Sequence, residues 1–293
     1  MTAPLTEIRK TLLSNEAIIE LFQQCFDEDG LPVGDVTTES IIDAEAQLTC
    51  DISLRESGVI AGLALLPIGL SLIDDIDIEF KKEDGEFSEP STVAVIQGNQ
   101  RSILAVERTI LNILGYASGI ATRTNHFVEL VAGTACKICD TRKTTPSLRL
   151  LDKYAVACGG GTLHRLGLHD AVLYKDNHLA GLANIKDDLA GAIAKVRGSQ
   201  ILFVEVEVDT LEQFAEVVEL DVDIILLDNM SIEMMQEAVE IRNASSRSPL
   251  LEASGGVNEE AVRSIAETGV DRVAIGGLTH QSTWLDFGLD VRQ

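Results

Sequence analysis

The sequence predicts an α/β protein in two parts, an N-terminal α+β layer and a C-terminal α/β barrel, joined by a long helix. Two observations carry this prediction. From about residue 134 onward, short apolar runs alternate with polar or glycine breaks and with helix-period segments. This rhythm is typical of parallel strands and helices that close into a barrel. The first hundred or so residues instead alternate apolar and polar side chains, as antiparallel strands do.

In the N-terminal part, "AEAQLTCDISLRESGVIAG" (44–62) predicts antiparallel strands with one solvated face. The segment "DDIDIEFKKEDGEF" (74–87) predicts a hairpin with its turn at Asp84–Gly85. Residues 100–131 then keep apolar side chains at helical spacing over many turns, which predicts the connecting helix.

In the C-terminal part, six apolar runs predict six parallel strands, each about one βα unit after the last. They are 134–143, 170–178, 201–208, 222–229, 249–256 and 271–278. Between them, "LEQFAEVVEL" (211–220) and "NEEAVRSIAETG" (258–269) have helical spacing, and the second ends on Gly269 in a capping position.

The charge of the chain excludes some partners. There are 47 acidic and 23 basic residues, a formal net charge of −24. Nucleic acids and anionic membranes need a basic field, so neither is expected as a partner. The N-terminus has no signal-peptide pattern, and glycine and proline interrupt the longest apolar stretch before the roughly 20 residues that a membrane span needs. A soluble, cytoplasmic protein is therefore expected.

The five cysteines are odd in number and scattered, which disfavours a disulfide framework. Cys136 and Cys139 form a C-x-x-C pair. Such a pair can be a redox centre or half of a zinc site, but no further ligands follow at suitable spacing. We favour small residues in a buried strand.

A cationic segment interrupts this acidic chain. Residues 140–178 hold six Lys or Arg against four Asp or Glu, a charge of +2, while the remaining residues carry −26. Arg142 and Lys143 directly follow the first barrel run, and His164 and Arg165 form a second pair. A guanidinium binds a carboxylate through two hydrogen bonds, so the two pairs suit a ligand with more than one carboxylate. The alternative is salt bridges to neighbouring acids.

Polar residues and glycines stand at the predicted strand ends, where barrels place their functional groups. They are Arg142, Lys143, Lys175, Glu207, Asp228, Ser254, Gly255, Gly256, Gly276 and Gly277. Glycine turns after the last two strands can expose backbone N–H groups to a phosphate. Plain tight turns are the alternative for either turn alone, and two together favour phosphate.

The run at 201–208 carries acids on one face, because Glu205, Glu207 and Asp209 alternate with valines. Such a face is usually solvated; inside a barrel, its acids would need lysine, metal or hydroxyl partners. Asp228 ends an apolar run and is the sharper candidate. Glu207 and Asp228 could hold ribose hydroxyls or a Mg²⁺ on a pyrophosphate. We expect structural roles for His126, His169 and His280.

Six segments together resemble the quinolinate phosphoribosyltransferase family: "ERTILNILGYASGIAT", "DTRKTTPSLRLLDKYAVACGGGTLHRLGLHDAVLYKDNH", "EVEVDTLEQ", "ILLDNM", "EASGGV" and "GVDRVAIGGLTH". The resemblance runs from "GDVTT" at 34–38 to the C-terminus. It implies an N-terminal α+β sandwich domain over 1–117, joined by 279–293. It also implies a C-terminal incomplete α/β barrel of about six strands over 118–278, with the active site.

The resemblance further implies an enzyme that makes nicotinate mononucleotide, CO₂ and pyrophosphate from quinolinate and phosphoribosyl pyrophosphate, with Mg²⁺, on the way to NAD. It implies a homodimer or a hexamer in which Arg108 reaches the partner's site. By motif, quinolinate would meet Arg142, Lys143, His164 and Arg165. Phosphoribosyl pyrophosphate would face Lys143 and Lys175, and its ribose and Mg²⁺ would be bound by Glu207 and Asp228. The 5′-phosphate would be held by Ser254, Gly255, Gly276 and Gly277.

Three positions depart from the family pattern: Gly115 in place of Gln, Ser147 in place of Gly, and Thr162–Leu163 before the His-Arg pair. None removes a charged ligand, and they concern loop shape and the subunit contact. The intact "KDNH" (175–178) counts against the molybdenum-associated ModD-like relatives. The alternatives left open are a relative acting on another aromatic acid, a barrel aldolase with Lys175 as Schiff-base nucleophile, and a non-catalytic phosphometabolite-binding protein.

Overall fold

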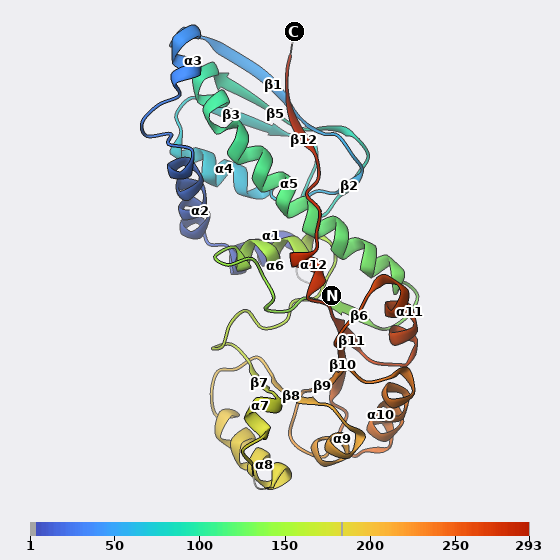
Figure 1. Cartoon of the computed structure of the whole chain (residues 1–293). Coiled ribbons are helices and arrows are strands. Elements are labelled where there is room, and N and C mark those ends of the chain that lie inside the picture. Colours follow the sequence, from blue (N-terminus) through green and yellow to red (C-terminus); the bar gives the residue numbers. More distant parts are fainter. Residues whose placement is uncertain (1–3, 183, 293) are drawn as a thin grey trace. The chain divides into compact units, whose positions relative to one another are not determined.

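The computed structural model describes residues 4–182 and 184–292, which form two compact units (Figure 1). The N-terminal unit holds residues up to 125, together with 145–160 and 278 onward. The barrel unit holds 126–144 and 161–277.

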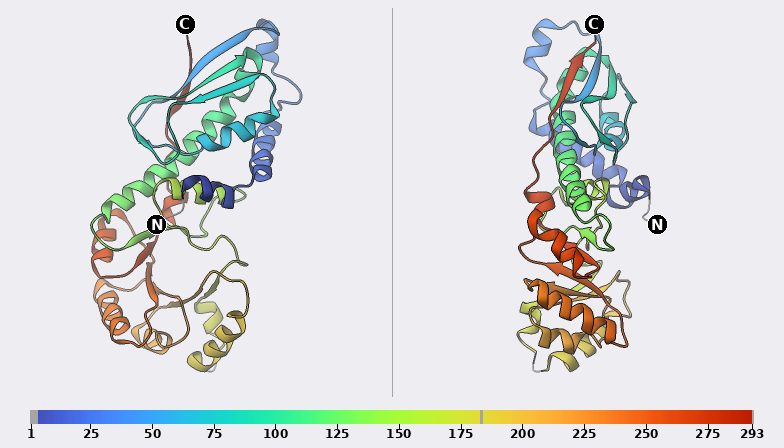
Figure 2. Two further views of the ribbon diagram at one scale, coloured as in Figure 1. Left: turned by 180° about the vertical axis from the view of Figure 1, so that it is seen from behind. Right: turned by 90° about the vertical axis from the view of Figure 1, so that its right-hand side faces the viewer.

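An antiparallel sheet forms the N-terminal unit's layer of strands, as the sequence predicted. Its order is β12 (Phe287–Val291), β1 (Gln47–Leu54), β5 (Ser91–Asn99), β3 (Ile76–Phe80). Cys50, Ile52 and Leu54 alternate along β1 and are all buried. The C-terminal strand β12 lies beside β1 (Figures 1 and 2). The last segment of the chain therefore completes the N-terminal sheet.

Helices of the N-terminal unit pack on this sheet and on one another. They are α1 (Leu5–Leu12), α2 (Asn15–Glu28), α3 (Val36–Ile41), α4 (Leu66–Gly69) with 3₁₀ turns at Leu63–Leu65 and Leu70–Leu72, and α6 (Arg149–Cys158). Side-chain oxygens cap two of them: Ser14 accepts from Ala17 N–H at the start of α2, and Asp35 accepts from Thr37 and Thr38 N–H at the start of α3.

The predicted connecting helix is α5 (Gln100–Leu130), 31 residues long. Ile103, Val106, Ile110, Leu114 and Ala117 lie at helical spacing and are all buried. By length and hydropathy alone α5 is long and apolar enough to cross a membrane, but 67% of its most apolar window is buried inside the protein. This burial is the pattern of a core helix.

The predicted hairpin at Asp84–Gly85 is wrong. The turn is present, but β3 pairs with β5, while β4 (Phe87–Ser88) pairs with β2 (Gly58–Val59). The Asp84 carboxylate accepts hydrogen bonds from Leu63 N–H (2.9 Å), Ala64 N–H (3.1 Å) and the Tyr154 hydroxyl (2.6 Å). These long-range bonds draw the turn toward the helices, which separates the two strands.

The barrel unit contains the six predicted parallel strands. Their order is β6 (Lys137–Cys139), β11 (Arg272–Ala274), β10 (Leu250–Ser254), β9 (Ile224–Asp228), β8 (Val204–Val208), β7 (Val172–Tyr174). Strands β6 and β7 are the two edges, so the barrel is incomplete. The helices are α7 (Asp176–Leu179), α8 (Ile185–Val196), α9 (Leu211–Val217), α10 (Ile232–Ala244), α11 (Glu259–Glu267) and α12 (Gly277–His280), of which α12 ends in the N-terminal unit.

The division into units differs from the domains expected over 1–117 and 118–278. The first boundary lies at 125/126, and residues 145–160 belong to the N-terminal unit. Helix α6 is held there by two bonds of its side chains: the Tyr116 hydroxyl donates to Asp152, and the Tyr154 hydroxyl donates to Asp84. Both are tertiary contacts that local sequence patterns do not encode.

The C-x-x-C cysteines are both buried free thiols, Cys139 in β6 and Cys136 just before it. Burial raises the pKa of the Cys136 thiol to about 12. A thiol that stays protonated at neutral pH is a poor nucleophile and a poor metal ligand. Cys136 and Cys139 therefore fit small buried residues of a strand better than a redox or zinc site.

Candidate active site

A pocket of about 480 Å³ lies within the barrel unit, at the carboxyl ends of the strands. Its lining contains many of the side chains singled out from the sequence: Arg142, Lys143, His164, Arg165, Lys175, Glu207, Asp228 and Ser254. Thr141, Leu173, Leu226, Glu252 and Ala274 complete the lining. Residues from seven separate stretches of the chain thus converge on one cavity.

Strand register explains this convergence. The strands are parallel, so their carboxyl ends meet at one edge, and Ser254 of β10 pairs directly with Asp228 of β9. Lys175 follows β7, and Glu207 lies one residue before the end of β8. Alternate residues of each strand face the barrel interior, which brings the acidic face of β8 inside.

Two guanidinium groups dominate one side of the pocket. The Nε atoms of Arg142 and Arg165 are buried, and neither has a hydrogen-bond partner among residues 4–182 and 184–292. Burial, and then the like charge of Arg142, lower the pKa of Arg165. Because a buried, unsatisfied cationic donor is costly, the arrangement favours a bound anion.

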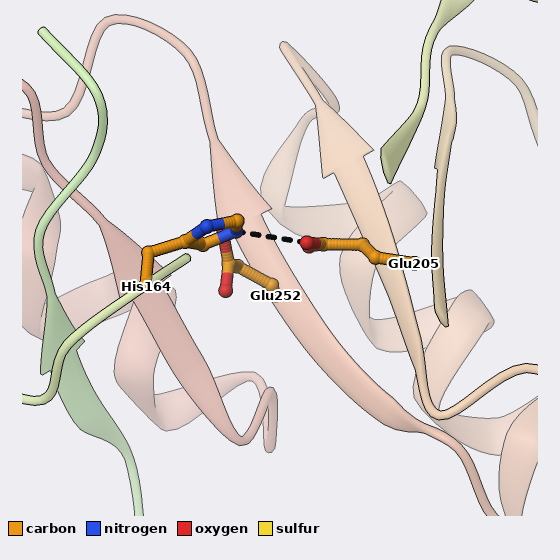
Figure 3. A group of neighbouring side chains, drawn as sticks. All are labelled: His164, Glu205 and Glu252. Carbon is orange, nitrogen blue, oxygen red and sulfur yellow. Dashed lines mark ion pairs between the residues drawn. The ribbon is translucent and has the colours of Figure 1, made fainter. Parts of the chain in front are cut away.

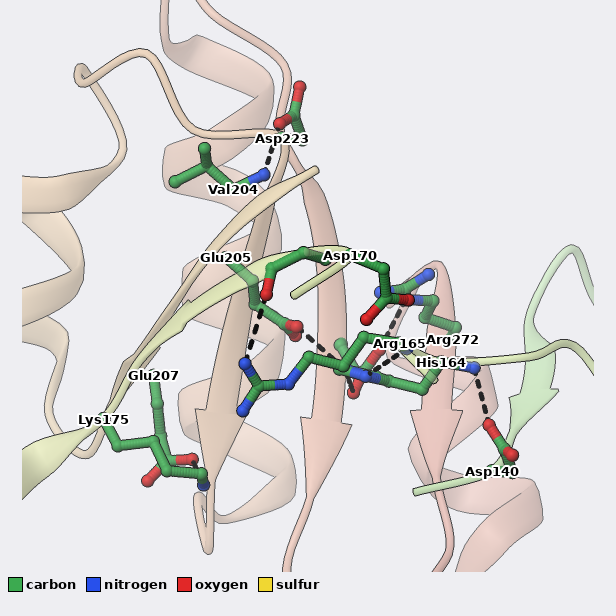
Figure 4. A network of polar contacts seen from close by, with 12 residues as sticks. Asp140, His164, Arg165, Asp170, Lys175, Val204, Glu205, Glu207, Asp223 and Arg272 are labelled. Atoms are coloured by element: carbon green, nitrogen blue, oxygen red, sulfur yellow. Dashed lines mark hydrogen bonds and ion pairs between the residues drawn. The ribbon is translucent and has the colours of Figure 1, made fainter. Parts of the chain in front are cut away.

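Lys175 and Glu207 form an ion pair at the pocket wall (Figure 4). The Glu207 side chain is only 9% exposed, whereas that of Lys175 is 44% exposed. Lys175 N–H also donates to His178 Nδ1 (3.0 Å), which fixes the start of α7. The buried carboxylate thus has the lysine partner that an inward-facing acid requires.

A tight turn fixes the neighbouring rim. Asn229 N–H donates to Ser254 O (2.9 Å), and Asn229 has a positive φ of 53°. Gly255 has φ 96°, and a Cβ there would lie 2.1 Å from Asn229 Oδ1. Only glycine fits this position, which holds Asp228 and Ser254 side by side. Gly255, Gly276 and Gly277 follow β10 and β11 closely but do not line the pocket.

His164 and Glu252 of the pocket lining belong to a buried charged group that also contains Glu205 and Arg272. Figure 3 shows His164, Glu205 and Glu252. Of these four residues, Glu252 and Arg272 were not identified as candidates from the sequence. His164 Nε2 lies 2.8 Å from Glu205 Oε2 and 3.5 Å from Glu252 Oε1, and Arg272 Nε lies 2.5 Å from Glu252 Oε2. The available signal was a charged residue within an otherwise apolar stretch, Glu252 in the run 249–256 and Arg272 in the run 271–278. Each lies two residues before the end of its strand.

Arg108 does not line this pocket. It lies on α5 in the N-terminal unit, with a side chain 63% exposed. It lines a separate hollow of about 370 Å³ together with residues that include Leu31, Val36 and Leu104. His126 is also outside the pocket, at the surface beside Glu259 (3.3 Å).

Comparison with known proteins identifies the family. Residues 35–118 match the N-terminal domain, and residues 120–290 the C-terminal domain, of the family described as quinolinate phosphoribosyl transferase. The chain belongs to the quinolinate phosphoribosyltransferase family. The two matched segments span most of the chain and meet within α5.

Relatives of this phosphoribosyltransferase family are similar over almost their whole length. The nicotinate-nucleotide pyrophosphorylase [carboxylating] of Mycobacterium leprae is 41% identical over 88% of this chain and 91% of its own. The solved structure of the nicotinate-nucleotide pyrophosphorylase from Francisella tularensis is 34% identical, with a TM-score of 0.89 over 96% of this chain and 98% of its own. That from Ehrlichia chaffeensis is 39% identical, with a TM-score of 0.83 over 93% and 98%.

Proposed function

We infer that this chain catalyses decarboxylating phosphoribosyl transfer from phosphoribosyl pyrophosphate to quinolinate, giving nicotinate mononucleotide, CO₂ and pyrophosphate for NAD biosynthesis. Relatives that carry this activity in their names support it. One observation of the site carries it furthest: the unsatisfied Nε atoms of Arg142 and Arg165 lie in the same pocket as Lys175, Glu207 and Asp228. The two arginines match a dicarboxylate, and Lys175, Glu207 and Asp228 match an activated sugar phosphate.

Quinolinate binding belongs to the cationic side. Arg142 and Arg165, with Lys143 on the same loop as Arg142, supply donors for two carboxylates. Held at two points, the pyridine ring presents its nitrogen to the anomeric carbon of the second substrate. Holding two reactants in a reactive geometry contributes to the rate as an increase in effective molarity.

Phosphoribosyl pyrophosphate belongs to the opposite side. Lys143 and Lys175 neutralise the leaving pyrophosphate, and Glu207 and Asp228 accept hydrogen bonds from ribose hydroxyls. These acids also stabilise positive charge on the ribose as the C–O bond to pyrophosphate breaks. The 5′-phosphate is held by Ser254 at the end of β10 and by Gly255, Gly276 and Gly277, which follow β10 and β11.

Magnesium fits the acids of this pocket as a partner of the substrate. Carboxylates are Mg²⁺ ligands, and in phosphate-binding sites one or two of them suffice beside substrate oxygens and water. Glu207 and Asp228 line one pocket, and one oxygen of Asp228 accepts from the Asn229 side chain (2.6 Å). When bound, Mg²⁺ would neutralise pyrophosphate charge.

Loss of CO₂ needs no dedicated acid or base. Once the ring nitrogen is bonded to ribose, its positive charge stabilises the electron pair left on the adjacent carbon when the bond to the carboxylate breaks. A proton from solvent then completes the ring. The protein's contribution at this stage is to keep the ring in place through the remaining carboxylate.

A homodimer or hexamer would bring Arg108 to the barrel pocket of a partner subunit. Arg108 is exposed, and the same unit exposes apolar side chains at Val33 (92%), Val36 (81%) and Ile41 (79%). Val36 and Arg108 line one hollow. Exposed apolar residues around a cation are a reason to expect a subunit interface. Light scattering tests the oligomeric state. The rate of quinolinate turnover by Arg108→Ala tests the contribution of Arg108.

We place this activity in the cytoplasm, with no nucleic-acid or membrane partner. The net charge of −24 opposes binding to polyanions and to anionic lipid. The small-molecule substrates need only the local positive charge of the pocket. Fractionation of cells expressing the chain would test the location.

Two alternative activities make different predictions. A relative acting on another aromatic acid would keep the anion pocket but prefer a monocarboxylate. A Schiff-base aldolase requires the Lys175 amine to attack a substrate carbonyl, whereas this amine is ion-paired with Glu207. Borohydride trapping of a substrate on Lys175 would support the aldolase.

The test mixes the protein with Mg²⁺, phosphoribosyl pyrophosphate and either quinolinate or nicotinate, and follows CO₂ and pyrophosphate. Release of both products with quinolinate, and neither with nicotinate, is expected. Pyrophosphate release with nicotinate alone would indicate the alternative acceptor. Saturable binding of both substrates without any product would indicate a non-catalytic binding protein.

A further inference from the structure

Buried charges at the pocket require an explanation. Glu205 and Glu252 are fully buried, and His164 and Arg272 are 7% and 8% exposed. Burying ionic groups is costly even when they are paired, so a purely apolar barrel core would be the stable choice. We call His164, Glu205, Glu252 and Arg272 the buried cluster.

Both ring nitrogens of His164 are already engaged with the protein. Nδ1 accepts a hydrogen bond from the Arg165 N–H (2.8 Å), so the ring proton resides on Nε2. That Nε2 lies 2.8 Å from Glu205 Oε2 and 3.5 Å from Glu252 Oε1 (Figure 3). These are charge contacts without hydrogen-bond alignment, since the carboxylate oxygens of both glutamates have no hydrogen-bond partner among the described residues. The ring of Phe203 packs edge-on against the imidazole, with centroids 5.5 Å apart. A substrate carboxylate at Nε2 would therefore meet the negative charges of Glu205 and Glu252.

The same geometry argues against a metal ion in this cluster. His164, Glu205 and Glu252 are close enough together to hold one. However, a metal would need the lone pair of Nε2, which carries the proton while Nδ1 accepts from Arg165. The guanidinium of Arg272, 2.5 Å from Glu252, supplies positive charge instead.

The backbone around His164 connects this cluster to Arg165 and to Asp140 (Figure 4). His164 N–H donates to Asp140 Oδ1 (2.6 Å), and Asp140 begins the loop that carries Arg142. Arg165 follows His164 directly, and its own N–H is the one held by the imidazole. Its guanidinium donates to Ala171 O (3.2 Å). A rotation of the imidazole would therefore move the peptide from which Arg165 projects.

We propose that Glu205 and His164 are positioning residues, in which Glu205 holds the imidazole and the imidazole holds the backbone of Arg165. The substrate carboxylates are then bound by Arg142 and Arg165, and His164 acts through Arg165. This inference rests on the proposed function. It assigns to Glu205 a role in quinolinate affinity although Glu205 does not line the pocket.

Steady-state kinetics of Glu205→Gln, His164→Gln and the double variant test this link. Gln at 205 keeps the size of the side chain and removes the charge that faces Nε2. We expect the KM for quinolinate to rise about 10-fold or more, and the KM for phosphoribosyl pyrophosphate to change less than about 2-fold. Residues that act in series are not additive, so the double variant should resemble the worse single variant.

A matched control removes another structural carboxylate of the same barrel. Asp223 accepts the Val204 N–H (2.6 Å) and pairs with Arg197 at the opposite ends of the strands. Asp223→Asn should lower thermal stability and leave the KM for quinolinate unchanged. If Glu205→Gln does not fold, Glu205→Asp is used in its place. This change keeps the charge but withdraws it by one methylene, and the same outcomes are expected.

The outcomes separate this inference from the proposed function. An unchanged KM for quinolinate in the folded Glu205 variant would overturn it, as would multiplicative effects in the double variant. Equal rises in both KM values would also overturn it, because general loosening of the barrel would explain them. No turnover of quinolinate by the unmodified chain would overturn the proposed function and this inference together.

Discussion

At the scale of single residues, Arg142 and Arg165 are the two guanidinium groups of the pocket lining. Each contributes a buried Nε without a hydrogen-bond partner among the described residues. An isolated cation could have been satisfied by one of the many acids of this chain. Two guanidiniums that share a pocket and whose charges repel each other instead favour a doubly negative ligand.

Arg142→Ala should raise the KM for quinolinate about 10²-fold, since roughly 3 kcal/mol of charge-assisted hydrogen bonding is lost. Binding of phosphoribosyl pyrophosphate, measured by calorimetry, should change little. Arg247→Ala, at an exposed arginine paired with Asp221, is the matched control and should leave both unchanged. Equal weakening of both substrates would contradict the assigned role.

Ser147, which replaces the glycine of the family pattern, lies in a tight turn with a positive φ. It follows Pro146 in a turn closed by Leu148 N–H to Thr145 O (3.1 Å), and its φ is +66°. Turns with proline at the second position and positive φ at the third favour glycine there. Ser147 departs from the family pattern in the sequence, and its positive φ shows that its backbone is strained.

Ser147→Gly should therefore stabilise the protein by about 0.5–1 kcal/mol, the strain relieved less the entropy that glycine adds to the unfolded chain. Urea unfolding measures it. The control is the reverse change, Gly256→Ala, at φ +58° with no neighbouring atoms within 4 Å, which should cost about 1 kcal/mol. Destabilisation by Ser147→Gly would show that the serine makes a compensating contact.

At the scale of elements, close contact between α5 and the C-terminal segment depends on two glycines. A Cβ at Gly119 would lie 2.2 Å from Thr283 O, and one at Gly115 would lie 2.7 Å from Leu285 O. Leu285 N–H donates to Gly115 O (3.0 Å). Gly115, noted in the sequence as a departure, thus allows the segment that leads into β12 to lie directly on the helix.

Gly119→Ala should destabilise the chain by about 2–3 kcal/mol because the clash is with backbone atoms. Hydrogen exchange at the Leu285 amide should also become faster. Gly191→Ala in α8, where nothing lies within 4 Å, should be neutral or stabilising by up to about 1 kcal/mol. A neutral Gly119→Ala would mean that the C-terminal segment can shift without loss.

The charged layer across β8, β10 and β11 makes stability depend on pH. Burial, and then the charge of Glu205, raise the pKa of Glu252 from 4.5 to about 7. A raised carboxyl pKa means that the folded state binds the proton more tightly than the unfolded state. The contribution of Glu252 to stability therefore falls as pH rises from about 4.5 to about 7.

Glu252→Gln removes this titration. The difference in unfolding free energy, wild type minus variant, should fall by up to about 3 kcal/mol between pH 5 and pH 8. Chemical denaturation at a series of pH values measures it. Parallel curves for the two proteins would show that the folded-state pKa of Glu252 is close to its ordinary value.

At the scale of the whole molecule, the pocket's positive charge stands against a chain with a net charge of −24. The segment 140–178 carries +2, and the remaining residues carry −26. Excess charge of one sign repels itself in the compact state. A local cationic pocket in an acidic chain attracts small anions, while the field around the protein opposes polyanions.

Raising NaCl from about 0.01 M to 0.5 M should raise the Tm by about 3 °C or more, because screening reduces the Debye length and with it the self-repulsion. Differential scanning calorimetry measures this. Sucrose at matched osmolality strengthens burial without screening charge and serves as the control. An equal shift in sucrose would show that electrostatic repulsion contributes little.

The strands of the barrel unit could be predicted because the signal for a strand is local. Each of β6 to β11 lies within an apolar run bounded by polar or glycine breaks, and all six were predicted. The same reasoning failed where distant residues decide. Asp84 bonds to Leu63 and Tyr154, so the predicted hairpin does not form. Helix α6 packs in the N-terminal unit, although its sequence lies between two barrel strands.

The sequence by itself determined the fold class, the family resemblance and many of the residues that converge on the pocket, because periodicity and strand ends can be read from the order of residues. Only the tertiary structure decided that Glu205 faces inward, that Arg272 meets Glu252 and that both nitrogens of His164 are engaged. The physical reason is that these contacts join strands that are distant in the chain. From the sequence alone, the partner of a charged residue in an apolar run cannot be identified.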